Sequence, residues 1–402
     1  MKKLIYVILA MLLLACGKEQ KETSFAIDSA SWDEIIKQGQ NQSVNLMMWT
    51  GDTKINAYMN SYIRPLVKEK YNIDLTISSG QGNTIVQILM AELQANKTES
   101  DLDMVWINGE TFYQLQQIKG LYGPWTSKLP NAEFIDFDNK FIGMDFQQPI
   151  AGYELPWGNV QMTIIYNSEN VKTPPMTREA LYKFAKENPG KFTWDNHFTG
   201  LTFLKALLID IAGGNGSLNG DFDEKKYQKY SSELWSYLTT LKPYLWKNGE
   251  TFPEAVAPMH QLFASGELWF TMSNNDAEVD NKIAEGIFPE TTRAYVPKYG
   301  TIQNSHYMGI SKMSINKAAA MVVANEMISA EAQLKKQDPS IWGDGTVLDT
   351  KKLPSLLKAK FNNQPNRKYA PKRSEITQRA LQEINPEYMI RLAEDFRKYM
   401  IK

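Results

Sequence analysis

The amino-acid sequence predicts an α/β protein built from two lobes. At 402 residues the chain is too long for one small core and suits two domains or two lobes. Strands alternate with helices in the first part of the chain, and the later part is mostly helical. Between the two parts, residues 160–166 follow the period-2 pattern of a strand. We interpret this strand, with residues 152–159 before it, as a crossover between the lobes; an ordinary strand of a larger single domain is the alternative.

The N-terminus has the pattern of a bacterial lipoprotein signal. Lys2 and Lys3 precede an apolar run, residues 4–14, that is too short to span a bilayer. The run leads into Leu-Ala-Cys-Gly, which resembles a lipobox with cleavage before Cys16 and lipid on its sulfur. Cys16 is the only cysteine, so the mature chain is expected to hold no disulfide and no thiol catalyst. An uncleaved anchor is the alternative.

The charge balance argues against capture of nucleic acid or of an anionic membrane surface. The chain carries 44 basic and 45 acidic residues. Its 10 tryptophans, 19 tyrosines and 17 phenylalanines provide flat contact area suited to small organic solutes, although most of them are expected in the core. Residues 17–30 are polar without periodicity and are expected to form a flexible tether.

The first lobe is expected to contain a parallel sheet. Apolar strand patterns occur at residues 44–48, 73–77 and 103–107. Helical spacing occupies the intervals between them, at residues 55–67 and 83–96. Strands joined in this way form right-handed parallel connections. Pro65 should kink the first helix or mark its restart.

Polar loops that contain glycine follow these three strands at one edge of the sheet. They are residues 49–52, 78–82 and 108–110. Ligands bind beyond the carboxyl ends of parallel strands, and glycine permits close approach of the backbone. Free amides of the helices that follow can hold polar ligand atoms. The alternative for Asp52, Ser78 and Asn83 is that they only cap helices.

The second lobe is expected to be mainly helical, with a few short strands. Helices are predicted at residues 199–212, 224–241 and 254–265, and strands at 192–194 and 268–272. Polar residues, 273–276, again follow a strand. Asn304 precedes a return strand at 307–310. Further helices are predicted at residues 316–329, 330–336 and 375–399, the last interrupted at Pro386.

These patterns divide the chain into consecutive parts. The signal covers residues 1–16 and the tether 17–30. The first lobe is expected to hold residues 31–155 and about 305–340, and the second lobe residues 156–304. Residues 341–402 are expected to form a C-terminal helical segment that packs on the lobes.

The sequence lacks the usual motifs of catalytic and metal sites. It has no phosphate-binding loop, no G-x-S-x-G elbow and no H-E-x-x-H pair. Of its three histidines, His197, His260 and His306, the last begins a strand, where a hydrogen-bonded structural role is favoured. Residues 219–224 are calcium-like in composition but lack the loop spacing. We expect no enzyme, cofactor or metal. An exported α/β hydrolase or carbohydrate-active lipoprotein is the alternative, because carboxylates can meet through folding.

Several motifs resemble the solute-binding components of bacterial ABC importers, in particular the YnjB-type family. The similarity runs from about residue 31 to 354, and the final fifty residues match poorly. The motifs are Trp49-Thr50-Gly51-Asp52-Thr53 with Ile55-Asn56, residues 102–112, Pro156-Trp157-Gly158, and residues 244–246, 302–306, 322–325 and 338–354.

This resemblance implies a two-lobe, hinged fold of the periplasmic-binding-protein type II class, with a ligand cleft between the lobes. It implies a monomer that is exported, lipid-anchored at the outer face of the cytoplasmic membrane or in the periplasm. Its partners would be a small solute and a permease driven by a separate ATPase. The resemblance weakly favours a thiamine-like or a cationic or aromatic solute. Placed on the predicted gap, the candidate ligand-binding residues are Trp49, Thr50, Asp52, Ser78, Asn108, Glu110, Trp157, Asn274 and Asn304.

In these roles the tryptophans would stack on a ring and the amides and Ser78 would orient the ligand. Glu110, and Asp52 with it, would neutralise a cationic group. For each tryptophan a place in the core is the alternative, and for each polar residue a cap or turn bond. Replacing Trp157 by alanine is therefore expected to weaken ligand binding without unfolding the protein.

Overall fold

The computed structural model describes residues 25–365 and 367–401. Cys16, the expected signal and most of the expected tether lie outside the described residues. Contacts divide the chain into a short unit, Met1–Ser31, and a large unit, Trp32–Lys402, and the architecture below is that of the large unit alone. None of the helices in the described residues combines the length and apolarity needed to cross a membrane.

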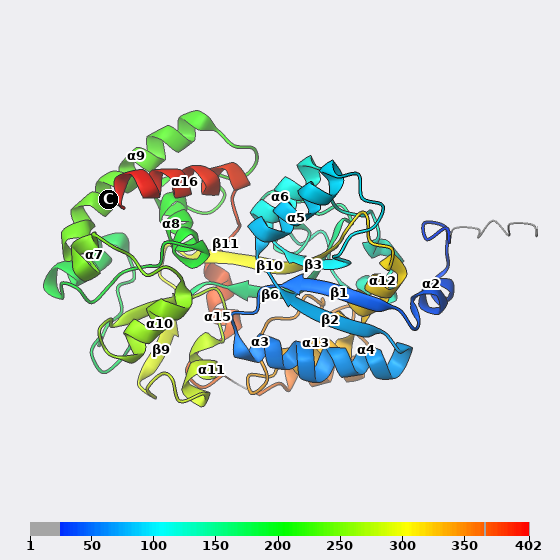
Figure 1. The fold of residues 1–402 in the computed structure, drawn as a ribbon. Coiled ribbons are helices and arrows are strands. Elements are labelled where there is room, and N and C mark those ends of the chain that lie inside the picture. The colour runs from blue at the N-terminus through cyan, green and yellow to red at the C-terminus, as the bar shows by residue number, and fades with distance from the viewer. Residues whose placement is uncertain (1–24, 366, 402) are drawn as a thin grey trace, which may run out of the picture. The chain divides into compact units, whose positions relative to one another are not determined.

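A mixed sheet organises the first lobe (Figure 1). Its parallel strands are β1 (Ser43–Met48), β2 (Asp74–Ser79) and β3 (Met104–Ile107), with β1 in the middle. The predicted parallel arrangement is therefore confirmed. Strand β10 (Thr301–Ile310) lies antiparallel to β3, and β6 (Glu154–Gln161) lies antiparallel to β10.

Helices cover this sheet on both faces. Helices α5 (Gly82–Gln94) and α6 (Gly109–Gln117) pack on one face, and α3 (Thr53–Tyr58), α4 (Arg64–Tyr71) and α13 (Ala330–Gln337) lie on the other (Figure 1). A π-helical turn (Met59–Ile63) separates α3 from α4, and Pro65 lies in the first turn of α4. This position confirms the restart predicted at Pro65. The physical reason is that proline lacks the N–H that would continue the hydrogen-bond ladder of a helix.

Strands β6 and β10 run side by side as the crossovers between the lobes. A bulge between His306 and Tyr307 lets β6 fit an extra residue into the ladder. The strand predicted at 160–166 is confirmed except at Met162, which separates the end of β6 from the start of β7, and β6 begins earlier than predicted, at Glu154. Pro156 and Gly158, within the predicted crossover, both lie in β6, where a bulged ladder accommodates them.

The second lobe is built on an antiparallel sheet. Its strands are β8 (Phe270–Ser273), β7 (Thr163–Asn167) and β9 (Thr292–Tyr295), with β7 in the middle. Its helices are α7 (Arg178–Glu187), α8 (Phe198–Ile211), α9 (Glu224–Leu241), α10 (Val256–Ala264) and α11 (Glu278–Ala284). The strand predicted at 192–194 is wrong: this segment is irregular, and its Phe192 and Trp194 side chains are buried in the aromatic core.

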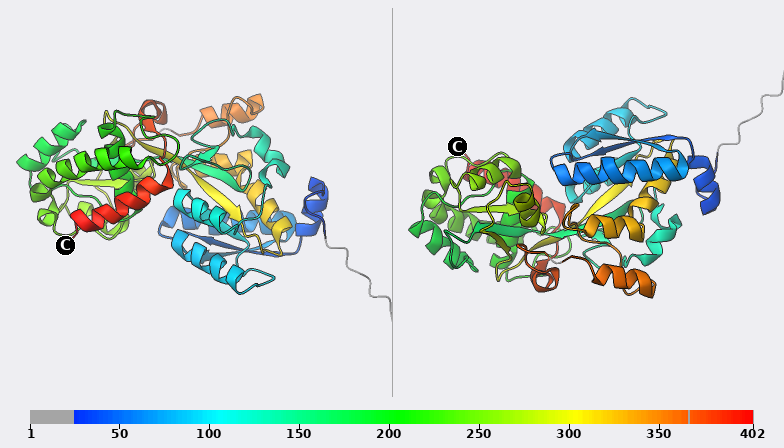
Figure 2. Two further views of the ribbon diagram at one scale, coloured as in Figure 1. Left: turned by 90° about the horizontal axis from the view of Figure 1, so that it is seen from above. Right: turned by 90° about the horizontal axis from the view of Figure 1, so that it is seen from below.

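The C-terminal segment returns to both lobes. Strand β11 (Ala380–Leu381) pairs with the start of β10, so the helix predicted over 375–399 is wrong in its first half. Pro386 begins helix α16 (Pro386–Tyr399), which packs on α8 and α9 (Figure 2).

The remaining helices are α2 (Trp32–Gly39), α12 (Lys317–Met327), α14 (Ser355–Asn362) and α15 (Arg373–Ile376). Short 3-10 turns and strands complete the fold: Thr126–Lys128, Pro130–Phe134, Lys242–Tyr244, Trp246–Gly249, Thr377–Arg379, β4 (Met144–Asp145) and β5 (Gln148–Pro149).

Candidate functional site

The ends of β1 and β2 are tied together at one edge of the first lobe. The hydroxyl oxygens of Thr50 and Ser79 lie 2.7 Å apart and share a hydrogen bond. The Asn56 amide donates to the Thr50 carbonyl at 2.8 Å. A Cβ on Gly51 would lie 2.5 Å from the Trp49 ring, so only glycine lets that ring fold back over the loop. Trp49 and Thr50, both predicted site residues, are thus held at this edge.

Two other predicted residues are engaged in local bonds. The Ser78 hydroxyl donates to the Asn45 side chain at 3.3 Å and to the Leu46 carbonyl at 3.4 Å, both on β1. Asp52 caps α3, because its Oδ1 accepts from the N–H groups of Lys54 and Ile55 at 2.8 and 2.9 Å. The capping role left open for Asp52 is therefore present, although its other oxygen lies 3.8 Å from the Lys282 ammonium of the second lobe.

Helices α3 and α11 bring the two lobes into contact through this ion pair and its neighbours. Thr53 at the start of α3 donates to Glu285 at 2.9 Å. Lys282 also lies 3.5 Å from Glu278 and 2.9 Å from Glu285. Burial, assisted by the negative charge of Asp52, raises the pKa of Glu278 to about 7. The contact between the lobes thus contains a carboxyl that titrates near neutrality.

Glu278 should make the protein less stable as the pH rises from about 4.5 to about 7. In this window the folded state still binds the Glu278 proton, which the unfolded state has lost. Because the folded state binds more protons, the free energy of unfolding decreases as the pH rises. The full effect is at most about 3 kcal/mol. Glu278→Gln keeps the neutral form at every pH, so its melting temperature should fall less over this window than that of the wild type. If the melting temperatures of the wild type and of Glu278→Gln changed equally with pH, the prediction would be contradicted.

A second cluster of charged side chains surrounds Lys205 of α8. This lysine is fully buried, and its ammonium lies 2.6 Å from the Glu383 carboxylate. It also lies over the Phe146 ring at 4.3 Å and the Phe198 ring at 5.5 Å, within range of cation–π attraction. Burial lowers the pKa of Lys205 and raises that of Glu383, since both charged forms lose solvation.

Further carboxylates from the first lobe face the same lysine. Burial raises the pKa of Glu110 and of Asp145, and the Lys205 charge partly offsets both shifts. Glu110 accepts a hydrogen bond from Gln114 at 3.2 Å. We name the Lys205 cluster by its members: Glu110, Asp145, Lys205, Asn304 and Glu383.

The Lys205 cluster joins predicted and unpredicted residues. Asn304 of β10 donates to Glu383 at 3.4 Å and Glu110 interacts electrostatically with Lys205, so two predicted residues belong to this cluster. Asn108 precedes Glu110 as the N-cap residue of α6, but within the described chain its side chain makes no capping bond. Sequence reasoning missed Lys205, although a lone lysine in the otherwise apolar run 203–209 was a usable signal. Asp145 and Glu383 carried no comparable pattern.

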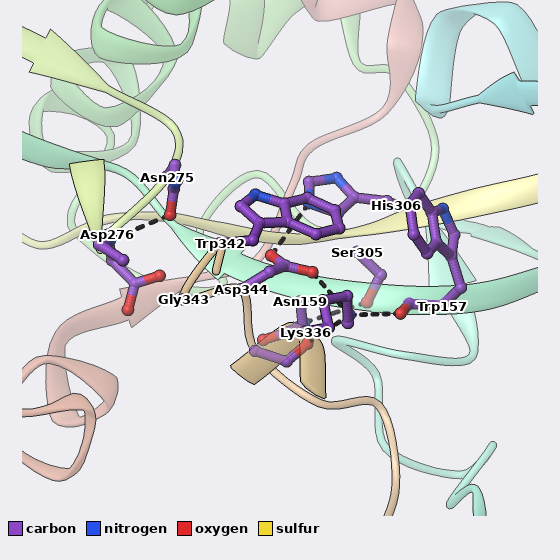
Figure 3. A network of polar contacts seen from close by, with 12 residues as sticks. Trp157, Asn159, Asn275, Asp276, Ser305, His306, Lys336, Trp342, Gly343 and Asp344 are labelled. Carbon is purple, nitrogen blue, oxygen red and sulfur yellow. Dashed lines mark hydrogen bonds and ion pairs between the residues drawn. The ribbon is translucent and has the colours of Figure 1, made fainter. Parts of the chain in front are cut away.

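A third cluster fixes the crossover strand β6 (Figure 3). The Lys336 ammonium donates to Asp344 at 2.6 Å, to the Gly345 carbonyl at 2.9 Å and to the Trp157 carbonyl. A Cβ on Gly158 would lie 2.2 Å from the Asp344 carboxylate, so glycine is needed for this approach. Burial lowers the pKa of Lys336 to about 8. Burial alone would raise the pKa of Asp344, but the charges of Lys336 and His306 hold it below its ordinary value.

Trp157 lies inside an aromatic cluster on the same face of the sheet (Figure 3). Its side chain is fully buried, with ring centroids 5.0 Å from Trp106 and 5.3 Å from Trp342. The His306 ring stacks on Trp342 at 6.1 Å, and its Nε2 lies 3.3 Å from Asp344. The sequence predicted that Trp157 faces the gap between the lobes, whereas its full burial and its aromatic neighbours are typical of a packed core.

The loop after β8 connects the second lobe to the C-terminal segment. Asp276 lies 2.6 Å from Arg367 and 2.9 Å from Arg373. Burial alone would raise the pKa of Asp276, but the positive charges of the two guanidinium groups have the larger effect and hold this pKa far below its ordinary value. Arg373 also donates to the Gly343 carbonyl at 2.9 Å, next to Asp344. The predicted Asn274 lies in this loop and donates to Thr199 of α8 at 3.1 Å.

Comparisons with known proteins agree with this architecture. A family model described as bacterial extracellular solute-binding protein matches residues 61–362. Protein YnjB of Escherichia coli (strain K12) is 36% identical over 335 residues, which cover 82% of this chain and 86% of that protein. The resemblance found in the sequence is thereby confirmed.

Solved structures with low sequence identity share the fold. The periplasmic binding protein AfuA of Actinobacillus pleuropneumoniae, 13% identical, has a TM-score of 0.61 and covers 89% of this chain and 98% of its own. The spermidine/putrescine ABC transporter substrate-binding protein PotD of Streptococcus pneumoniae, 16% identical, has a TM-score of 0.60 and covers 89% and 99%. The chain therefore belongs to the bacterial extracellular solute-binding proteins, the solute-capturing components of ABC importers, and has their two-lobe fold.

Proposed function

We propose that this protein captures a small organic, cationic solute between its lobes and delivers it to the permease of an ABC importer. The observation that carries the proposal is the Lys205 cluster. Its members come from α6 and β4 of the first lobe, from α8 of the second lobe, from the crossover β10 and from the C-terminal segment. A ligand that contacts both lobes binds the closed state best, and so drives closure.

The charge of the Lys205 cluster favours a cation. Three carboxyl groups, those of Glu110, Asp145 and Glu383, face one ammonium group. Burial raises the pKa of all three carboxyls, and a positively charged ligand group would favour their ionised forms, with an attraction that is stronger in a buried site than in water. Thiamine-like molecules and polyamines both satisfy this criterion, and PotD, which has the same fold, is named for spermidine and putrescine.

The first test is native mass spectrometry of the purified protein, followed by a thermal-shift screen of thiamine, its pyrimidine half, polyamines and sugars. A cation at a hundredfold excess over its Kd should stabilise the folded state by about 2.7 kcal/mol. Turnover of a chromogenic ester or glycoside would favour the enzyme alternative instead. Binding only of neutral sugars would contradict the proposed charge preference.

Lipid on Cys16 completes the proposal. The sequence before Cys16 supports export and anchoring, and an anchor raises the effective concentration near the permease without any new contact. We propose that the anchored protein acts as a monomer. The same mass spectrometry, on protein extracted in detergent, should show acyl groups that the Cys16→Ser variant lacks; equal masses, apart from the substitution, would refute the anchor.

A further inference from the structure

A small cavity lies against the Lys205 cluster at the crossover strand β10. Asp145, Gln303, Asn304 and Glu383 line it, and its volume is about 10 Å³. Such a volume holds the centre of about one water-sized group. Gln303 and Asn304 are only partly buried, so the cavity has access to solvent on their side.

One oxygen in the lining of this cavity has unused hydrogen-bonding capacity. Asp145 is 2% exposed, and within the described residues its Oδ2 has no hydrogen-bond partner. Its carboxylate accepts a hydrogen bond from the backbone N–H of Gly109. A buried acceptor without a donor costs about 1–3 kcal/mol, so a donor that reaches it is favoured. A cationic donor would also favour the ionised form of Asp145, whose pKa burial raises, so the cavity suits a small, positively charged hydrogen-bond donor.

The other groups around the cavity add to this preference. Glu383 has its Oε2 on Lys205, its Oε1 accepts a long bond from Asn304, and its carboxylate also accepts from the backbone N–H of Ile384. Amide side chains supply carbonyl oxygens as further acceptors. Lys140 also lines the cavity, but it is exposed, and water screens its charge. The buried polar part of the lining thus contains two carboxyl groups, and the Asp145 Oδ2 has no hydrogen-bond partner among the described residues.

We propose that this cavity binds a primary ammonium group of the transported solute, with Asp145 as its main acceptor. This inference rests on the proposed function and narrows it. A primary ammonium is about the size of water and has three donors for the oxygens described above. A quaternary ammonium or a thiazolium carries no N–H donor on its charged nitrogen and exceeds the volume. In the described residues no cluster of three or more His, Cys, Asp or Glu side chains is suited to a metal ion.

The test compares primary amines with their permethylated counterparts on the full-length protein. Putrescine, ethanolamine and the aminomethyl pyrimidine half of thiamine are each paired with the corresponding N-trimethyl compound, and binding is measured by calorimetry. At least one primary amine should bind at least tenfold more tightly than its counterpart. Equal affinities within every pair would overturn the inference.

Two substitutions in the segment that contains Asp145 test whether the ammonium group binds in this cavity. Asp145→Asn, which keeps the shape of the side chain, should weaken binding of that amine at least tenfold. Asp138→Asn changes an exposed acid of the same segment and should leave the affinity unchanged. Unaltered binding by Asp145→Asn would overturn the inference; if that variant fails to fold, the paired ligands decide alone.

Failure of this inference can be told apart from failure of the proposed function. If a solute without a primary amine binds and none of the amines does, the protein is a solute receptor but the cavity is not its ammonium subsite. If neither the amines nor the wider screen nor native mass spectrometry yields any bound solute, the proposed function itself fails.

Discussion

Replacing Lys336 by methionine is expected to lower the free energy of unfolding by about 3–5 kcal/mol. The substitution leaves Asp344 fully buried without its ammonium partner. It also removes a donor from the carbonyl groups of Trp157 and Gly345. The loss should appear in urea unfolding as a lower midpoint with an unchanged slope.

Two controls separate this loss from a general effect of removing a lysine. Lys335→Met changes the exposed neighbour on the same helix and should alter stability by no more than about 0.5 kcal/mol. The double variant Lys336→Met with Asp344→Leu removes both buried charges and should recover much of the loss. If Lys336→Met were no more destabilising than Lys335→Met, the buried ion pair would not stabilise the fold.

Replacing Trp157 by alanine should destabilise the folded state by about 3–5 kcal/mol. The fully buried ring packs between Trp106 and Trp342, and its removal leaves a cavity that neighbouring rings fill only in part. This differs from the expectation drawn from the sequence, which was a loss of ligand binding without unfolding. Urea unfolding of Trp157→Ala, next to ligand affinity measured by calorimetry, distinguishes the two.

Trp49 provides the matched control for Trp157. Its ring lies at the edge of the first lobe and is only partly buried, so Trp49→Ala should cost much less stability. A solute-stacking role for Trp49 would instead appear as weaker ligand binding. Should Trp49→Ala and Trp157→Ala unfold at the same urea concentration, the core role of Trp157 would be wrong.

The sheet of the first lobe could be predicted because its signals are local. Strands β1 to β3 and the helices between them each carry their own periodicity, and Pro65 marks the irregular helix directly. The two-residue strand β11 could not be predicted, because its only reason to be extended is its pairing with β10. Local patterns fail where a distant partner decides the conformation.

The candidate site was predictable only in part for the same reason. Glu110 follows a strand and Asn304 was expected just before one, which placed both at the edge of a sheet; Asn304 in fact lies inside β10, which begins at Thr301. Lys205 and Glu383 are 178 positions apart in sequence, so only folding brings these charges together. The sequence left two roles open for Trp157, because a tryptophan beside a glycine fits both a ligand platform and a packed core, and the buried ring favours the core.

Helix α13 holds the early part of β6 by its backbone. Lys336 and Gln333 both donate to the backbone carbonyl of Trp157, so the early part of β6 must travel with α13 as one rigid piece. Downstream, at Met162, the chain leaves one sheet for the other. Because both bonds go to a main-chain oxygen, the tie between α13 and β6 does not depend on which side chain occupies position 157.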